Sequence, residues 1–541
     1  MNKFDPKGGT RMRSTACMHL ALAILASVAF ISLLSVFLTP IWETNDDVGM
    51  SMIAHGYGFV ADGSPNLIFS NVLWGHIVRA MPQFGDVFGY TIASTLVIAA
   101  SCAAILYFLM RSGVTPVHAL LAGGIIFLWP ILFPQFTLNS GLLAVAAVLG
   151  WRAYAETLQR LDLVLATVLG FLSYLIRNQE FWLVLAVSVP LYPWKLVLRN
   201  RAMQVALVLL ALAIIGAASL NKAAYDTSAW KKFAEFNQAR APYTDFRAGD
   251  QIRNRPDVLQ RHGYSSNDID LIGGWFFVDA RLSDPARLNA MLGDVGLRNW
   301  VQRGFGLGLE SLRLLMVDRL WPMLACALLI ALISPSRRMF LLMVAVAAAV
   351  FALGAIGRPG VTRVQYPLCA LVLLVAVCST RSRTRLTRGV AALALAGTAA
   401  IVVHAVWPYQ VEAVARIKSA RVQLQQLPKG MLAVWGASFP YEAAFPPFDE
   451  RKQARAVEIY PMGVTTGAPF SIAMKEEAAG RGFLARLTSA SGMNVSVSPV
   501  EVELLRTYCK EHFDLQLVDK LLYQHDGLII HNVKCERPVT S

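Results

Sequence analysis

Eleven apolar stretches recur along the chain, and each is long enough, or nearly so, to cross a lipid bilayer as a helix. About 20 apolar residues span a hydrocarbon core of ~30 Å. The pair at 161–176 and 181–194 can also form a broken or re-entrant span. The stretches lie at about 17–38, 88–110, 117–133, 138–151, 161–176, 181–194, 203–219, 320–334, 339–357, 364–379 and 389–407. This pattern predicts an α-helical polytopic membrane protein with about eleven crossings.

The composition excludes the main classes of soluble protein. Only 16% of the 541 residues are charged and 55% are hydrophobic, whereas soluble domains carry about 25% charged residues. The chain therefore lacks the polar surface to cover several globular domains. An ordinary cytosolic enzyme, a disordered protein and a disulfide scaffold are excluded together.

Basic residues gather in five of the segments that connect the apolar stretches. Membrane proteins keep their excess of Lys and Arg in cytoplasmic loops, and alternation from a cytoplasmic N-terminus places all five there. The segments are Arg111, 152–160, Lys195 to Arg201, Arg337 with Arg338, and 381–388. No small-x-small cleavage site stands between the first stretch and Trp42, so this stretch is interpreted as a retained helix. We expect a multi-pass plasma-membrane protein, in the inner membrane if the source is a Gram-negative bacterium.

The net charge of +14 is explained by this excess of Lys and Arg in the cytoplasmic loops. No basic run is interleaved with aromatic residues, so no nucleic-acid partner is expected. The bilayer itself is the expected environment.

The same alternation places three long segments on the outer side. Residues 1–407 are predicted to form a transmembrane domain with outer loops at 40–86 and 220–319. Residues 408–541 are predicted to form a soluble extracytoplasmic α/β domain, because helix-like sequence at 498–513 alternates with β-like sequence at 431–436 and 526–535. The amphipathic segment 306–320 is expected to be a helix on the membrane surface.

Cysteine use agrees with this topology. Five of the seven cysteines lie in or beside apolar stretches, and only Cys509 and Cys535 lie in the tail. A pair of thiols in an oxidising compartment suggests a disulfide. No CxxC or Cys/His spacing indicates a structural zinc site. No cofactor is predicted with certainty, and a divalent metal is left open.

Two adjacent carboxylates follow the first apolar stretch almost at once. Asp46 and Asp47 stand at the start of a segment that reads as a short helix ending at His55, with Thr44 or Asn45 as its N-cap. The helix dipole favours a charged carboxylate in the first turn, so we expect a lowered pKa for both. Such groups suit an ionised base or a metal ligand. Alternatively, they only cap a surface helix.

Other polar residues are expected at the same membrane face. Arg177 and Glu180 lie at the outer end of the fifth stretch, and Gln135 lies in the turn between the third and fourth. Arg358 and Arg363 lie between the ninth and tenth, and guanidinium groups match phosphate oxygens well. We take these residues, with His55, as candidate substrate- or phosphate-binding groups. The alternative is that the arginines reach toward lipid headgroups.

The NDD motif of Asn45, Asp46 and Asp47, the outer turn at Gln135 and the many spans resemble the GT-C class of integral membrane glycosyltransferases. The resemblance implies a GT-C-like fold and transfer of a sugar from a polyprenyl-phosphate-linked donor on the outer face of the membrane. The acceptor would be a glycan, a lipid or a protein, and the enzyme a hexosyl- or pentosyltransferase. The resemblance further implies that Asp46 or Asp47 is catalytic. The acidic pair in this chain is Asp-Asp, whereas the better-known mannosyl- and aminoarabinose transferases of this class carry Asp-Glu.

Three other functions remain open at this point. A transporter or flippase would place its polar groups near the bilayer midplane and show repeated halves; here the groups lie at outer ends and no repeat is found. A polymerase or ligase of lipid-linked glycans would need a glycan-length donor. A non-enzymatic scaffold would tolerate loss of both aspartates.

Overall fold

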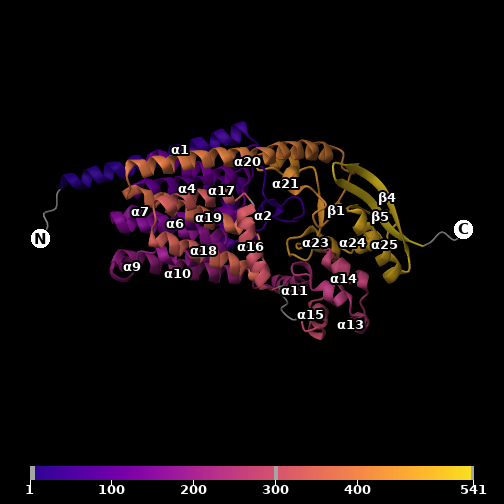
Figure 1. The fold of residues 1–541 in the computed structure, drawn as a ribbon. Coiled ribbons are helices and arrows are strands. Elements are labelled where there is room, and N and C mark those ends of the chain that lie inside the picture. Colours follow the sequence, from indigo (N-terminus) through magenta and orange to yellow (C-terminus); the bar gives the residue numbers. More distant parts are fainter. Residues whose placement is uncertain (1–5, 298–302, 318, 538–541) are drawn as a thin grey trace.

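The computed structural model describes residues 6–297, 303–317 and 319–537 of the chain. Figure 1 shows a bundle of long helices that holds the N-terminus, and a second region of short helices and strands that leads to the C-terminus. We call the first the helix bundle. The second, formed by residues 228–297 and 432–536, we call the head.

Each of the eleven apolar stretches falls on a helix of the bundle, and the predicted polytopic architecture is confirmed. By length and composition, seven helices of the described residues can cross a membrane, or eight if one bent pair counts as a span. The seven are α1 (Pro6–Phe37), α4 (Gly89–Arg111), α6 (Phe136–Thr157), α10 (Arg201–Ala224), α18 (Arg337–Ala355), α19 (Thr362–Ser379) and α20 (Arg385–Gln425).

The other four stretches fall on helices of fewer than 18 residues. The stretch at 161–176 forms one helix, and after Arg177 the stretch at 181–194 covers a second helix, a short 3-10 helix and the start of a third helix. The bent pair joins α16 to α17 at 85°. The shorter elements are α5 (Pro116–Leu132), α7 (Arg160–Ile176), α8 (Asn178–Val187), η1 (Val189–Leu191), α9 (Trp194–Arg199), α16 (Phe305–Val317), α17 (Trp321–Ile333) and η2 (Thr380–Ser382).

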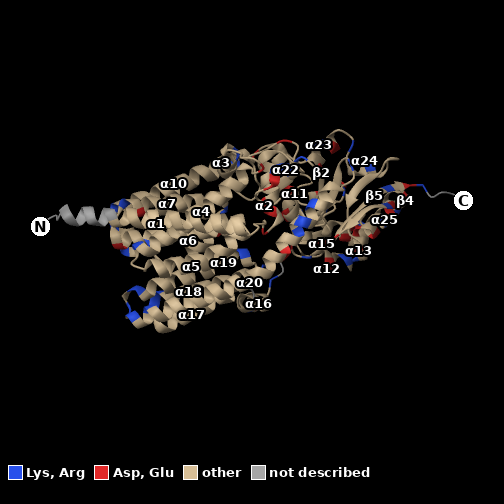
Figure 2. Ribbon diagram, turned by 90° about the horizontal axis from the view of Figure 1, so that it is seen from above, with Lys and Arg blue, Asp and Glu red and all other residues tan. Residues whose placement is uncertain are grey.

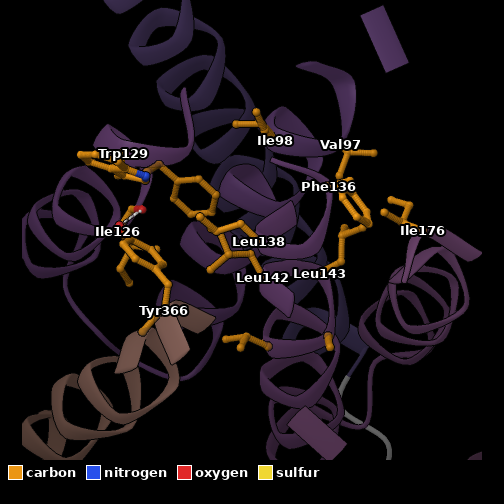
Figure 3. Packing of buried hydrophobic residues seen from close by; sticks show 14 of the residues in the cluster. Val97, Ile98, Ile126, Trp129, Phe136, Leu138, Leu142, Leu143, Ile176 and Tyr366 are labelled. Carbon is orange, nitrogen blue, oxygen red and sulfur yellow. Dashed lines mark hydrogen bonds between the residues drawn. The ribbon is translucent and has the colours of Figure 1, made fainter. Parts of the chain in front are cut away.

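Helix α6 forms the centre of the bundle, and small residues let its neighbours approach closely. A Cβ on Gly141 would come within 2.3 Å of Pro367 on α19, and one on Gly150 within 2.6 Å of Phe108 on α4. Close backbone approach of this kind favours helix association in lipid. Figure 3 shows the core around α6, where the Tyr366 hydroxyl donates a hydrogen bond to the Ile126 carbonyl at 2.8 Å.

The segment expected to lie on the membrane surface forms α16 and packs against α18. A Cβ on Gly308 of α16 would come within 2.5 Å of Phe351 on α18. Residue 318 of that segment lies outside the described residues.

Helix α20 joins the bundle to the head. It has 41 residues, which at 1.5 Å per residue corresponds to a length of about 60 Å. It runs along the bundle and continues toward the head (Figure 1). The domain boundary predicted at residue 408 falls inside this helix. There the Gln410 side chain accepts a hydrogen bond from the Thr39 backbone at 3.1 Å.

The head contains a five-stranded mixed sheet in the order β2-β1-β3-β5-β4. β1 pairs in parallel with β2 and β3, whereas β5 is antiparallel to β3 and β4. A disulfide joins Cys509 to Cys535, with Cα atoms 5.8 Å apart. The elements are β1 (Leu432–Trp435), α21 (Tyr441–Ala444), α22 (Glu450–Ala454), β2 (Ile459–Met462), α23 (Ile472–Ala478), α24 (Phe483–Leu487), β3 (Met493–Ser496), α25 (Pro499–Phe513), β4 (Gln516–His525) and β5 (Leu528–Glu536).

Two segments that are far apart in the sequence share the core of the head. Phe276 packs against Trp435 and Tyr508, with ring centroids 5.0 and 5.2 Å apart. The Trp435 indole also donates a hydrogen bond to the Gly274 carbonyl. The predicted middle loop and C-terminal domain therefore form one body. The loop contributes α11 (Ser228–Thr244), α12 (Gly249–Arg253), α13 (Pro256–His262), α14 (Ser266–Gly273) and α15 (Pro285–Asp294).

The loop at residues 40–86 forms α2 (Asn45–His55) and α3 (Val72–Ala80) and contacts the head. The α2 helix ends at His55 as predicted, and Thr44 is its N-cap residue. Past α2, the Ile459 N–H donates to the Gly58 carbonyl at 3.0 Å, and the Ala61 N–H to the Phe470 carbonyl at 2.9 Å. This loop is thus held between the bundle and the head.

Candidate functional site

A cavity of about 550 Å³ opens between α2 and the head. Its walls come from α2 and the residues that follow it, from the ends of β1 and β2, and from the middle loop. The lining residues are Asn45, Asp46, Gly49, Met50, Ile53, Phe59, Ile68, Phe69, Gly274, Trp275, Val434, Gly436, Ala437, Tyr441, Pro461, Met462, Gly463, Val464, Thr465 and Glu501.

The strand order explains why a cavity forms here. The chain leaves β1 for β2 on one side and then crosses back to β3 on the other. In such sheets a crevice opens outside the carboxyl ends of the strands, where the connections diverge. Gly436 follows β1 with φ +59°, a backbone conformation that favours glycine. The exposed strand ends can thus supply backbone groups to a ligand.

Asp46 is the acidic residue of the NDD motif that reaches this cavity. Its carboxylate lies 3.7 Å from the Arg363 guanidinium, and the two side chains are 28% and 36% exposed. Asp46 also stands in the first turn of α2, where the helix dipole favours negative charge. A carboxylate paired with a guanidinium therefore stands at the cavity wall.

Four other candidate residues lie near this carboxylate. Charges on Asp46, Glu180, Arg358 and Arg363 all act on Arg177, so the fold brings these five candidate residues into one electrostatic cluster. The Arg177 guanidinium lies 5.1 Å from the Phe136 ring centroid. Guanidinium groups in such a cluster are suited to binding an anion.

Two of these residues hold polar atoms that have no hydrogen-bond partner among the described residues. Arg177 Nε and Glu180 Oε2 are both shielded from solvent and unpaired. The Arg177 guanidinium also lies 5.9 Å from the Phe69 ring centroid, and Phe69 lines the cavity. Buried polar groups normally find a partner, so such atoms mark a place where a ligand can bind.

Asp47 has a different environment from its neighbour. Its side chain is fully buried and accepts hydrogen bonds from the Tyr90 hydroxyl at 2.8 Å and the Phe136 N–H at 3.0 Å. Burial raises its pKa well above the usual range, although the Tyr90 hydrogen bond opposes this shift. The predicted lowering of the pKa by the helix dipole is wrong for Asp47. Its contacts join α2 to α4 and α6.

Gln135 and His55 also lie away from the cavity lining. Gln135 is fully buried, and its side chain caps α6 by accepting from the Leu138 N–H at 3.0 Å. His55 Nε2 accepts from the Tyr90 N–H at 3.1 Å. Burial, with the charge of Arg79, lowers the His55 pKa to about 4. His55 is therefore neutral near pH 7, and both residues position helices at the edge of the site.

One cluster of the described residues has the arrangement of metal ligands. It consists of Asp268, Glu511 and His512, where α14 meets α25. None of the three lines the cavity. The Arg281 guanidinium lies 2.9 Å from His512 Nδ1, and its positive charge disfavours a cation at this point.

Two cavity residues have a strained backbone. Ile68 has φ +65° and Trp275 has φ +71°, a region that β-branched and bulky residues rarely enter. The Phe69 N–H donates to the Leu67 carbonyl at 2.7 Å, which closes a γ-turn around Ile68. Such strain costs of order 1–3 kcal/mol each and gathers at ligand sites. Nothing in the sequence marks either position.

A buried carboxylate of the head also contacts α2, and sequence reasoning missed it. Glu450 is fully buried and accepts a hydrogen bond from the Ser51 hydroxyl at 3.2 Å. Ser51 in turn accepts from the Tyr57 hydroxyl at 3.1 Å. Burial raises the Glu450 pKa to about 8. This contact ties α22 to α2, next to the wall that carries Asp46.

No protein-family model and no curated protein matches this chain. Two solved structures of ArnT from Cupriavidus metallidurans are similar over nearly their whole length. The apo structure has a TM-score of 0.39 and 11% identity, and covers 97% of this chain and 98% of that one. The structure bound to undecaprenyl phosphate has a TM-score of 0.39 and 12% identity, and covers 96% and 98%.

Proposed function

We propose that this chain is a membrane glycosyltransferase. It transfers a sugar from a polyprenyl-phosphate-linked donor to a glycan, lipid or protein acceptor, at the membrane face where the head lies. The observation that carries the proposal is Asp46, a carboxylate at the wall of the cavity that is paired with Arg363. The likeness of the NDD motif to the GT-C class points the same way.

The cluster suits the chemistry of glycosyl transfer from a lipid phosphate. The bond between the anomeric carbon and the phosphate oxygen breaks, and the phosphate leaves with the electron pair. Guanidinium groups stabilise the negative charge that develops on it, and Arg177, Arg358 and Arg363 are the candidates for this role. The ion pair of Arg363 with Asp46 would keep the leaving group close to the acceptor.

Asp46 is assigned to the acceptor. As the acceptor hydroxyl attacks the anomeric carbon, its proton passes to the Asp46 carboxylate, which acts as general base. The ion pair with Arg363 orients the carboxylate. Apolar neighbours such as Met50 and Phe59 limit access of water to the reacting groups.

The head is assigned to the outside of the membrane. Figure 2 shows Lys and Arg residues gathered at the end of the bundle that lies away from the head. The positive-inside rule places that end in the cytoplasm. The Cys509–Cys535 disulfide supports the same orientation, since disulfides persist in oxidising compartments.

The proposal is tested by the substitution Asp46→Asn in a strain that lacks the gene. Mass spectrometry of polyprenyl lipids and envelope glycans compares wild type, this variant and Asp62→Asn at equal expression. Asp62 is exposed in the same loop and does not line the cavity. Loss of a sugar mass, restored by wild type and Asp62→Asn but not by Asp46→Asn, supports catalysis. Full restoration by Asp46→Asn would contradict it.

A further inference from the structure

A second cavity lies in the helix bundle, remote from the head, where two connections between helices meet helix α6. It has a volume of about 310 Å³. Its walls come from α6, from the turn between α17 and α18, and from the end of α19 with η2. The lining residues are Arg152, Pro335, Ser336, Arg338, Val375, Cys378, Ser379, Arg381, Ser382 and Arg383. We call it the arginine cleft.

Two of its four arginines are held in place by the walls. Arg383 donates from Nε to the Ser334 hydroxyl at 3.1 Å and from Nη2 to the Pro335 carbonyl at 3.0 Å. Arg381 donates to the Ser112 carbonyl at 2.8 Å and pairs with Glu156. These bonds fix the shape of the cleft and leave its positive charge largely uncompensated.

Arg152 is the residue that points most directly to a ligand. Its Nη1 is shielded from solvent and has no hydrogen-bond partner among the described residues. The charged groups that act on it include Arg338, Arg381 and one carboxylate, Glu156. A buried guanidinium donor without an acceptor, among cations, is the arrangement that an anion satisfies.

The start of α18 adds a second attraction for negative charge. Ser336 is the N-cap residue of this 19-residue helix, but its side chain makes no capping hydrogen bond. The first N–H groups of α18 therefore lack the acceptor that an N-cap side chain usually supplies. Helix N-termini of this kind bind phosphate through their N–H groups and dipole.

We propose that the arginine cleft binds a phosphate-bearing anion. Phosphate oxygens accept from Arg152 Nη1, from Arg338 and from the N–H groups at the start of α18. The ligand is either the headgroup of an anionic phospholipid in the leaflet next to the cleft or a soluble phosphoryl compound. Both present the same phosphate oxygens. Basic pockets between helix ends at the cytoplasmic face are known to take lipid phosphates. This site is independent of the cavity at Asp46.

The test uses the purified full-length protein in detergent and follows its thermal unfolding. Phosphatidylglycerol, phosphatidylcholine and sodium pyrophosphate are titrated separately, because a ligand of the folded state raises the unfolding temperature. Arg338→Gln is compared with Arg337→Gln. Both arginines are exposed neighbours, but only Arg338 lines the cleft. Arg152→Gln is measured as a third variant.

We expect phosphatidylglycerol or pyrophosphate to stabilise wild type and Arg337→Gln equally. Arg338→Gln should raise the dissociation constant of the stabilising ligand about tenfold, which corresponds to the loss of one charge-assisted hydrogen bond. Stabilisation by phosphatidylglycerol alone identifies a lipid headgroup, and equal stabilisation by pyrophosphate identifies a soluble ligand. Stabilisation by neither, or equal weakening in Arg337→Gln and Arg338→Gln, overturns the proposal. The comparison of Arg338→Gln with Arg337→Gln tests the proposal even if Arg152→Gln fails to fold.

Discussion

Asp46 and Asp47 are neighbours on one helix, yet their carboxylates lie in different environments. Asp46 lines the cavity and pairs with Arg363, whereas Asp47 is fully buried and accepts the Tyr90 hydroxyl. Successive residues of a helix are separated by about 100° around its axis. The first carboxylate thereby faces the cavity, and the second holds the helix in place.

Replacing Asp47 should therefore damage stability. In Asp47→Ala, the Tyr90 hydroxyl and the Phe136 N–H lose their acceptor while buried. Each group left without a partner costs about 1–3 kcal/mol. In detergent, the unfolding temperature of Asp47→Ala should be clearly lower than that of wild type. Asp46→Ala removes only a partly exposed ion pair, so its stability should change by about 0.5 kcal/mol or less. Equal losses in the two variants would contradict this assignment.

Replacing Arg363 should impair catalysis more than folding. Under the proposed function, Arg363→Gln removes a cation that orients Asp46 and stabilises the leaving phosphate. Loss of one such preorganised donor lowers kcat by about 10²–10³-fold. Sugar transfer by purified protein is the measurement, with Arg313→Gln as control because Arg313 is 76% exposed on α16. A rate for Arg363→Gln within the range of the control would remove Arg363 from the mechanism.

Glu450 should make stability depend on pH. Its pKa is raised to about 8 in the folded protein from an ordinary 4.5. The folded state therefore retains a proton that the unfolded state releases, and stability falls as pH rises from 4.5 to about 8. The loss is at most about 1.4 kcal/mol per pH unit.

The substitution Glu450→Gln should remove this dependence. Glutamine keeps the shape of the side chain and an acceptor for Ser51, but it does not titrate. Unfolding temperatures measured from pH 5 to 8 should fall less steeply for Glu450→Gln than for wild type. Parallel curves for the two proteins would show that Glu450 does not carry the effect.

The orientation of the chain can be tested without reference to its function. Asp62→Cys places a thiol in the loop beside the head, and Arg337→Cys places one at the opposite end of the bundle. Both positions are exposed. In intact cells, a membrane-impermeant thiol reagent should label Asp62→Cys but not Arg337→Cys above the wild-type background. The reverse pattern would place the head in the cytoplasm.

Loss of the disulfide should destabilise the head. Cys509 and Cys535 are separated by 26 residues along the chain, and closing a loop of this size stabilises the folded state by about 3 kcal/mol. Cys509→Ser should therefore increase proteolysis within the head, as followed by gel analysis of fragments. Cys326→Ser, at a buried free thiol of the bundle, is the control and should leave cleavage of the head unchanged.

Much of the architecture can be predicted from the sequence by itself. Apolar stretches become helices because a segment in lipid must satisfy its backbone hydrogen bonds internally. Local signals likewise predict the α2 helix up to His55, the helix at 499–513, and the strands β1 and β5. The candidate arginines could be found because charge at the end of an apolar stretch is costly and conspicuous.

Only the tertiary structure decided which of these residues share a site. Whether Asp46 or Asp47 reaches the cavity depends on how α2 packs against α4 and α6. Trp275 lines the cavity because the middle loop and the sheet share one hydrophobic core. These two segments are more than 150 residues apart in the chain, and the Trp435–Gly274 hydrogen bond is one of the contacts between them. Local sequence signals carry propensity and periodicity over about a dozen residues. Burial, which sets the pKa of Asp47 and Glu450, is a property of the packed chain.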